Sequence, residues 1–271
     1  MKKAYEDIKN AKRIVVKVGT STITYKNGKT NLQIVDTLCR VLSDLHNRGK
    51  EIVLVSSGAI GMAVGKLGLA KKPDETVKKQ AVAAVGQCEL MYLYDKLFSG
   101  YNNTVAQILI TGDDIAIPRR KRSMQNTINE LISMGIIPIV NENDSVTAFE
   151  IENIGDNDNL SALVAEMIDA DLLILFSDID GLYDQDPHFD KNAKKIDCVT
   201  DIDEIEDMAG ISSSTQGTGG MITKLEAARR ATEAGIHMVI ANGNNVSSLY
   251  DILDASPVGT LFVSKNFKAC K

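Results

Sequence analysis

Cysteine is scarce in this 271-residue chain, and its placement excludes the structures that cysteine usually builds. The four cysteines lie far apart and form no C-x-x-C pair; they are Cys39, Cys88, Cys198 and Cys270. A chain of this length needs no disulfide framework, so we expect reduced thiols. None of the three histidines has a Ser or Cys motif around it and G-x-S-x-G is absent, which disfavours histidine-based hydrolysis.

Proline is rare, no apolar run is long, and basic residues are fewer than acidic ones. Five prolines and no Pro-rich or Ser/Gly-rich run leave no obvious linker, so we expect one domain over residues 1–271. No segment approaches the roughly eighteen apolar residues of a membrane span, and the N-terminus has no apolar signal core, which favours a cytoplasmic location. A net charge of −6 argues against nucleic-acid binding, although residues 119–122 form a local basic cluster.

Short β-branched runs alternate with longer amphipathic ones along the whole chain. Strands are predicted at residues 13–18, 51–55, 105–110, 136–140, 171–176, 236–240 and 260–263. Several of these runs are apolar at consecutive positions, which is typical of parallel strands buried on both faces. Helices are predicted at residues 32–45, 75–98, 124–134, 160–168 and 221–234, with Gly49 and Gly235 ending the first and last.

The order of these elements predicts an α/β fold, a three-layer αβα sandwich with a mainly parallel central sheet. In such sheets, ligands bind where the carboxyl ends of the strands meet the following loops. The chemistry of this chain should therefore be found in those loops.

Two loops after predicted strands suit anion binding. Residues 17–21 (KVGTS) offer an ammonium group and backbone N–H groups beside a glycine, and residues 56–61 (SSGAIG) place small side chains at a helix start. The alternatives are a lysine that reaches solvent from a strand end, and an ordinary N-cap with tight packing.

Two further loops are rich in carboxylates and amides. Residues 141–144 (NEND) and 155–159 (GDNDN) are repulsive unless a cation or a cationic ligand group compensates. The alternative is a solvated acidic turn in which Asp158 or Asn159 caps a helix. A calcium loop is disfavoured because the second segment lacks the required ligand and glycine, so we expect no protein-held metal site.

The last two candidate loops are residues 177–184 and the glycine-rich residues 215–224 (TQGTGGMITK). The first could cradle a nucleotide or form only an Asx turn, and the second could bind phosphate or be a flexible surface loop. In the second, Lys224 is predicted in the first turn of a helix. Neither the Walker nor the Rossmann pattern is present. Taken together, loops that follow strands and two lysines that bracket a carboxylate cluster predict a phosphoryl-transfer site.

Five segments together resemble the glutamate 5-kinase branch of the amino acid kinase family. They are residues 16–21, 55–60, 141–144, 155–162 and 217–224. The resemblance covers essentially the whole chain, and it implies transfer of phosphate from ATP to the γ-carboxylate of L-glutamate, the first step of proline biosynthesis. It also implies magnesium, delivered with the nucleotide.

The resemblance also assigns roles to individual residues. Lys17 and Lys224 match the lysines that hold the transferring phosphoryl group, and Asp158 matches the carboxylate that positions them. The implied glutamate-binding residues are Ser57, Asp144 and Asn157, with Asp156 beside them. The implied ATP-binding residues are Lys17, Gly19, Thr20, Ser177, Asp178, Thr218, Gly219, Gly220, Met221, Ile222, Thr223 and Lys224.

Many members of this branch continue into a C-terminal PUA domain, whereas this sequence stops after its last predicted strand, so we expect a kinase-only form. The resemblance further implies feedback inhibition by L-proline and a homo-oligomer. Two alternatives stay open: a family member that phosphorylates another carboxylate or phosphate, and a ligand-binding regulator without turnover. The presence of both lysines and Asp158 argues against the regulator, because a sensor needs no phosphoryl-stabilising pair.

Overall fold

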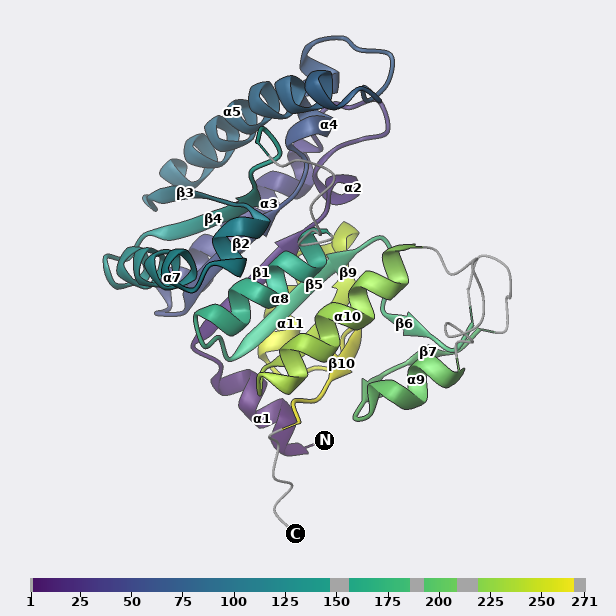
Figure 1. Ribbon diagram of the computed structural model, residues 1–271. Helices are drawn as coiled ribbons and strands as arrows, with labels where there is room; N and C mark the ends of the chain where they lie inside the picture. The colour runs from purple at the N-terminus through teal and green to yellow at the C-terminus, as the bar shows by residue number, and fades with distance from the viewer. Residues whose placement is uncertain (1, 147–155, 186–192, 209–218, 266–271) are drawn as a thin grey trace.

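The computed structural model describes residues 2–146, 156–185, 193–208 and 219–265, and a central sheet runs through them (Figure 1). Its strands are β1 (Arg13–Val18), β2 (Glu51–Ser56), β3 (Val105–Ile110), β4 (Ile137–Glu142), β5 (Leu172–Ser177), β8 (Cys198–Val199), β9 (His237–Asn242) and β10 (Thr260–Phe262). Their order across the sheet is β3-β4-β2-β1-β5-β9-β10-β8. All neighbours pair in parallel except β10, which is antiparallel to β9.

Helices cover both faces of this sheet. They are α1 (Lys2–Asn10), α2 (Thr20–Ile23), α3 (Leu32–Asn47), α4 (Ala59–Lys66), α5 (Thr76–Gly100), α6 (Gly112–Ala116), α7 (Pro118–Ser133), α8 (Asn157–Met167), α9 (Ile202–Met208), α10 (Gly219–Glu233), α11 (Ser248–Leu253) and a short 3-10 helix (Gly243–Asn245). In the part of the chain that the structure describes, none of these helices is long and apolar enough to cross a membrane.

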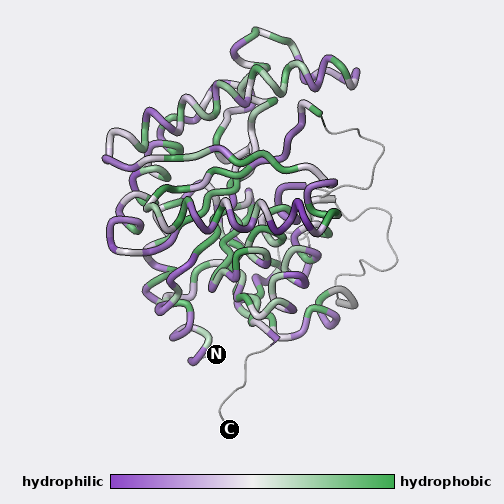
Figure 2. Tube along the Cα trace, turned by 60° about the vertical axis from the view of Figure 1, so that its left-hand side comes forward, coloured by the Kyte–Doolittle hydropathy of each residue, from purple (hydrophilic) through white to green (hydrophobic). Residues whose placement is uncertain are grey.

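Two hydrophobic cores, one on each face of the sheet, produce the three layers. Helices α1, α3, α4, α5 and α11 contribute to the first core, and α7, α8, α9 and α10 contribute to the second. In β1, Ile14, Val16 and Val18 belong to the first core and Val15 to the second, as the alternation of side chains along a strand requires. Figure 2 shows hydrophobic stretches in the middle of the molecule. The three-layer prediction is confirmed.

Several boundaries differ from the sequence prediction. Helix α7 begins at Pro118, six residues before the predicted start, because proline is well suited to the first helical position and the basic residues that follow it carry no apolar periodicity. Helix α8 begins at Asn157 rather than residue 160. The sequence patterns also missed the helices α1, α2, α6, α9 and α11 and the two-residue strands β8, β6 (Leu182–Tyr183) and β7 (Lys195–Ile196). The strands and the four- to five-residue helices α2 and α6 are too short to show a clear period.

A glycine allows α4 and α5 to approach until their backbones touch. A Cβ atom placed on Gly86 of α5 would lie 1.7 Å from the carbonyl oxygen of Ala59, the first residue of α4. Only a residue without a Cβ fits there. Because Ala59 directly follows the loop of Ser57 and Gly58, this contact also sets where that loop lies.

We expect Gly86→Ala to lower the free energy of unfolding by about 3 kcal/mol, since neither backbone can move aside without disturbing its own helix. Gly100→Ala is the matched control, because Gly100 ends the same helix and a Cβ there would meet nothing within 4 Å. That control should be neutral or slightly stabilising. Urea denaturation of both variants measures the difference, and equal stabilities would contradict the packing described here.

Candidate active site

The candidate site lies at the carboxyl edge of the sheet, where the strand order reverses beside β1. Strand β1 pairs with β2 on one side and with β5 on the other. The chain leaves these strands in different directions, and such a point opens a crevice for ligands. The ends of β1, β2 and β4, the first turn of α8 and the first two turns of α10 supply residues to this site, and the ion pairs and hydrogen bonds between them show that they meet.

A buried carboxylate between two lysines forms the centre of this site. Lys17 Nζ pairs with Asp158 Oδ1, and Lys224 Nζ lies 3.1 Å from Asp158 Oδ2. The side chain of Asp158 is 2% exposed, against 10% for Lys17 and 13% for Lys224. Lys17 follows the same alternation in β1 as Val15, so it faces α8 and α10 rather than the first core. The structure thus brings together the three residues predicted as catalytic.

Lys224 reaches this cluster from a different position than the sequence predicted. Helix α10 already begins at Gly219, so Lys224 lies in its second turn rather than its first. Helical side chains tilt toward the N-terminus of their helix, and a long lysine can therefore return to the first turn. Its Nζ donates a hydrogen bond to the carbonyl oxygen of Gly220, at 3.0 Å. The ammonium group consequently still lies at the helix start.

The charge of Asp158 is maintained by its two partners. Burial acts to raise the pKa of this carboxyl group, but the charges and hydrogen bonds of Lys17 and Lys224 outweigh it, and the pKa is lowered. Asp158 is therefore an anion at neutral pH with both oxygens engaged. It cannot act as a proton acceptor and hold the lysines at the same time.

Glycines leave the backbone open beside both ammonium groups. A Cβ atom on Gly19 would lie 3.6 Å from Lys17 Nζ, and one on Gly220 would lie 3.8 Å from Lys224 Nζ. Two cations next to accessible backbone, together with the first turn of the 15-residue helix α10, suit the phosphates of a nucleotide. Thr218, which was also predicted to bind ATP, lies outside the described residues.

The other predicted nucleotide residues lie at the ends of β1 and β5. Gly19 precedes the short helix α2, and Thr20 is exposed. Ser177 ends β5 and donates a hydrogen bond from Oγ to Asp178 Oδ1 at 3.0 Å. The sequence patterns missed Asn242, at the end of β9, which donates a hydrogen bond to Asp180. Its only signal in the sequence was its place two residues after the end of the strand predicted at residues 236–240.

A chain of polar side chains leads away from the lysines. Asn157 Nδ2 donates to Ser57 Oγ at 2.6 Å and to Asn141 Oδ1 at 2.9 Å, and Asn141 Nδ2 donates to Gln87 Oε1 at 2.9 Å. Ser57 and Asn157 were predicted together, and the structure brings them together. Gln87 was missed because it lies within α5, where the pattern indicated only an amphipathic helix and a polar residue is expected to face solvent.

Asp156 caps helix α8. Its Oδ1 accepts hydrogen bonds from the backbone N–H groups of Asp158, at 2.9 Å, and Asn159, at 3.2 Å. The alternative in which Asp158 or Asn159 is the cap is therefore wrong. A carboxylate at this position satisfies two free N–H groups and suits the positive end of the helix dipole. A role for Asp156 in substrate binding stays a prediction.

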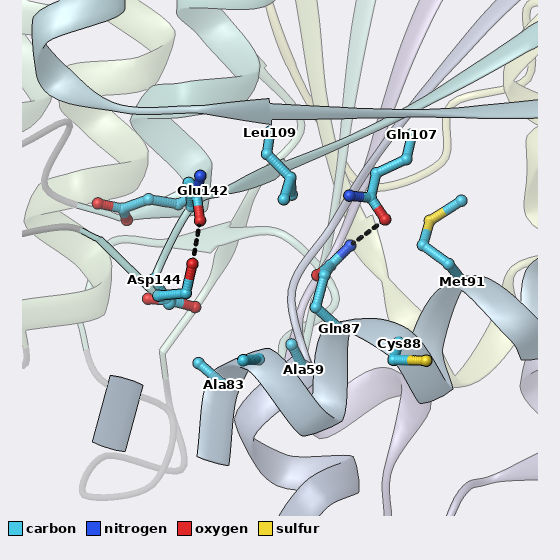
Figure 3. A pocket seen from close by; sticks show the side chains of 12 residues that line it. Ala59, Ala83, Gln87, Cys88, Met91, Gln107, Leu109, Glu142 and Asp144 are labelled. Atoms are coloured by element: carbon cyan, nitrogen blue, oxygen red, sulfur yellow. Dashed lines mark hydrogen bonds between the residues drawn. The ribbon is translucent and has the colours of Figure 1, made fainter. Parts of the chain in front are cut away.

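Asp144 lines a separate pocket, which Gln87 at the end of this series of hydrogen bonds also lines (Figure 3). The pocket has a volume of about 440 Å³, and its other walls come from α5, β3 and the start of α4. Burial raises the pKa of Asp144, and the charges of Lys72 and Lys79 only partly oppose this. Within the described residues its carboxylate forms no ion pair, so a cationic ligand group would find a partner there.

The described residues of this site include no cluster of metal-binding side chains. In the described ranges, no group of three or more His, Cys, Asp or Glu residues could hold a metal ion. The central carboxylate, Asp158, is already occupied by two lysines.

Comparisons with known proteins agree with this geometry. The sequence profile of the amino acid kinase family matches residues 12–242. Glutamate 5-kinase from Clostridium perfringens is 55% identical over 262 residues, which cover 95% of this chain and 97% of that protein. Glutamate 5-kinase from Clostridium acetobutylicum is 51% identical over 260 residues, which cover 96% and 97%.

Solved structures share the fold at much lower identity. Carbamate kinase from Giardia lamblia bound to AMP-PNP has a TM-score of 0.67 at 14% identity and covers 95% of this chain and 100% of that one. UMP kinase from Bacillus anthracis has a TM-score of 0.64 at 16% identity, with coverages of 94% and 97%. At these identities the likeness bears on the fold alone.

We expect Asp158→Asn to lower the free energy of unfolding at pH 7 by about 3 kcal/mol, because two poorly exposed ammonium groups would lose their partner. The pKa of Asp158 is lowered by folding, so the stabilisation is present above its ordinary value of 3.8 and is lost as the pH falls further. Urea denaturation at pH 7 and below pH 4 measures the difference in free energy of unfolding between Asp158→Asn and the unmutated chain. We expect this difference to shrink in acid.

Asp74→Asn is the matched control for this measurement. Asp74 pairs with Lys71 on the surface, where its side chain is 84% exposed. Such a pair contributes about 0 to 1 kcal/mol, so the control should stay near the unmutated chain at both pH values. A constant gap for Asp158→Asn across the pH range would contradict the assignment of its stabilisation to charge.

Proposed function

The chain belongs to the amino acid kinase family, and on this premise we propose that it transfers the γ-phosphoryl group of ATP to the γ-carboxylate of L-glutamate. The product is L-glutamyl 5-phosphate, and the reaction opens proline biosynthesis. The observation that carries the proposal is the buried Lys17–Asp158–Lys224 cluster. Hydrogen bonds from Asn157 through Asn141 to Gln87 connect it to a pocket that Asp144 also lines. The names of the relatives that share about half of the residues support the choice of acceptor.

The two lysines oppose the repulsion that makes this reaction slow. A carboxylate that attacks a γ-phosphate brings two anions together, and more charge develops on the bridging oxygen as ADP leaves. Lys17 and Lys224 place fixed positive charge on either side of one anchor, Asp158, so neither needs to reorient during the reaction. A ligand-binding regulator would have no use for this paired arrangement.

Magnesium fits the site only as a companion of the nucleotide. With both oxygens of Asp158 engaged by lysines, an ion would be held by phosphate oxygens and water, where it would neutralise phosphate charge. The residues that would hold the nucleotide are Lys17, Gly19, Ser177 and the first two turns of α10.

The acceptor would lie between the lysines and Asp144. Free glutamate carries an α-ammonium group, and Asp144 offers a carboxylate that forms no ion pair within the described residues, although the charges of Lys72 and Lys79 act on it. Ser57 and Asn157 lie next to the lysine cluster, where the γ-carboxylate must arrive. Glutamate would therefore be held at both ends.

Four further properties are proposed on the same premise. We propose a single kinase domain, inhibition by L-proline and a cytoplasmic location. The cysteines in the described ranges are unpaired, which supports the proposed location. We also propose self-association, which would cover the exposed apolar side chains of Val77, Val85 and Tyr92 on one long helix, α5.

We expect Lys17→Ala and Lys224→Ala each to lower kcat by about a hundredfold to a thousandfold, with a much smaller change in the KM for glutamate, because their charges act mainly in the transition state. Lys96→Ala, on the exposed side of α5, is the control and should keep full activity. A coupled assay of ADP release measures both constants. Full activity in either site variant would remove that lysine from the chemistry.

The acceptor is tested by trapping the acyl phosphate as a hydroxamate from glutamate, aspartate and N-acetylglutamate in parallel. Glutamate should be preferred by a wide margin. Asp144→Asn should weaken its use by about a hundredfold and remove most of its advantage over N-acetylglutamate, which has no α-ammonium group. Asp95→Asn, on the exposed part of α5, is the control.

The pH dependence gives a second readout of Asp144. Because burial raises the pKa of Asp144 above its ordinary 3.8, the KM for glutamate should rise as the pH falls toward that raised value and the carboxylate takes up a proton. This rise should be absent in Asp144→Asn. A preference of the unmutated chain for aspartate or N-acetylglutamate would overturn the proposed function.

A further inference from the structure

A series of side-chain hydrogen bonds connects helix α5 to the predicted glutamate site, and all of them run from donor to acceptor in the same direction. Gln87 Nε2 lies 3.5 Å from Gln107 Oε1, and the two side chains face each other across the pocket in Figure 3. Gln87 Oε1 accepts from Asn141, whose Oδ1 accepts from Asn157. Gln87 and Asn141 therefore each donate to one neighbour and accept from the next, and Asn157 donates at the end of the series.

A backbone N–H group fixes the donor-to-acceptor direction of this series of hydrogen bonds. The N–H of Glu142 donates to Asn141 Oδ1 at 2.9 Å, and a backbone N–H can only donate. The atom of Asn141 on that side must therefore be its oxygen, and its Nδ2 must face Gln87. Gln87 consequently has to present an oxygen. The assignment of oxygen and nitrogen in these amides follows from this one donor.

The same logic reaches the substrate side. Asn157 faces the oxygen of Asn141, so it must present Nδ2 there, and the second hydrogen of Nδ2 goes to Ser57 Oγ. Asn157 Oδ1 has no hydrogen-bond partner among the described residues. Ser57 Oγ accepts from Asn157, and its own hydrogen has no acceptor within the described ranges. Ser57 is thus left as a donor.

We propose that Gln87 is a positioning residue for the acceptor: by holding Asn141 through its oxygen, it fixes Asn157 so that the Ser57 hydroxyl donates to the substrate carboxylate nearest the lysines. This inference rests on the proposed function, because it takes a carboxylate as the group that meets Ser57. Asn157 Oδ1 is the matching acceptor for a donor group of the ligand. Among the described residues, the hydrogen bonds of Gln87 go to Gln107 and Asn141 and not to the lysine cluster, and its side chain lines the pocket of Figure 3.

Gln87→Met keeps the length of the side chain and removes the oxygen. We expect it to raise the KM for glutamate by about tenfold, since one oriented hydrogen bond is lost, while the KM for ATP changes less than twofold. Gln87→Glu keeps an oxygen toward Asn141 in either protonation state and should restore the KM for glutamate to within about twofold. Gln33→Met, the same exchange on the exposed side of α3, is the control and should change nothing.

A double-mutant cycle separates positioning from a general structural effect. If Gln87 acts through Ser57, then Gln87→Met should add little in a chain that already carries Ser57→Ala. Thermal unfolding of every variant is measured alongside. Additive losses, or a Gln87→Glu variant as impaired as Gln87→Met, would overturn the inference, as would a Gln87→Met variant that behaves like Gln33→Met.

The two proposals fail in different ways. If the unmutated chain forms no hydroxamate from glutamate, the proposed function is wrong, and the role of Gln87 falls with it. If the unmutated chain forms it readily and only the Gln87 variants fail to respond as described, the function stands and the inference alone is wrong.

Discussion

The contact between Asp158 and its two lysines is the constraint on which the rest of the site depends. A carboxylate at 2% exposure would take up a proton unless nearby cations compensate for its burial. The two cations, Lys17 in β1 and Lys224 in α10, are 207 residues apart in the sequence. They meet at Asp158 because β1 lies in the middle of the sheet and Asp158 lies in the first turn of α8. The fold can therefore be understood as the scaffold that brings three charges to one point.

Much of the fold could be predicted because its determinants are local. Runs such as residues 172–176 are apolar on both faces, and only a strand covered on two sides buries such a run completely. Gly49 and Gly235, with φ of 88° and 84°, follow the ends of α3 and α10, because glycine adopts the left-handed conformation that ends a helix. The antiparallel β10 was not predictable in this way, since strand direction depends on how the chain returns and not on the strand's own residues.

The site was predicted in part for the same reason. Lys17 lies near the end of β1, Ser57 follows β2, and Asn157 and Asp158 begin α8, so their place in the sequence already indicates the edge of the sheet. The roles within the acidic loop were not predictable, because Asp156 and Asp158 are chemically identical and only the geometry shows that one caps α8 while the other binds lysines. Gln87 gave no signal, since a polar residue within a long helix is usually a solvent-facing one.

The charge cluster also has a sign opposite to that of the whole chain. Two ammonium groups and one carboxylate carry a net positive charge, whereas the chain carries −6. At a distance, a polyanion such as a nucleotide is repelled by the molecule as a whole, and attraction begins only near the cluster. Dissolved salt screens exposed, distant charges more strongly than buried ones, with a Debye length of about 8 Å at physiological ionic strength. Moderate salt therefore weakens the long-range repulsion more than it weakens the local attraction, and the Lys17–Lys224 cluster can still attract a phosphate chain to an acidic protein.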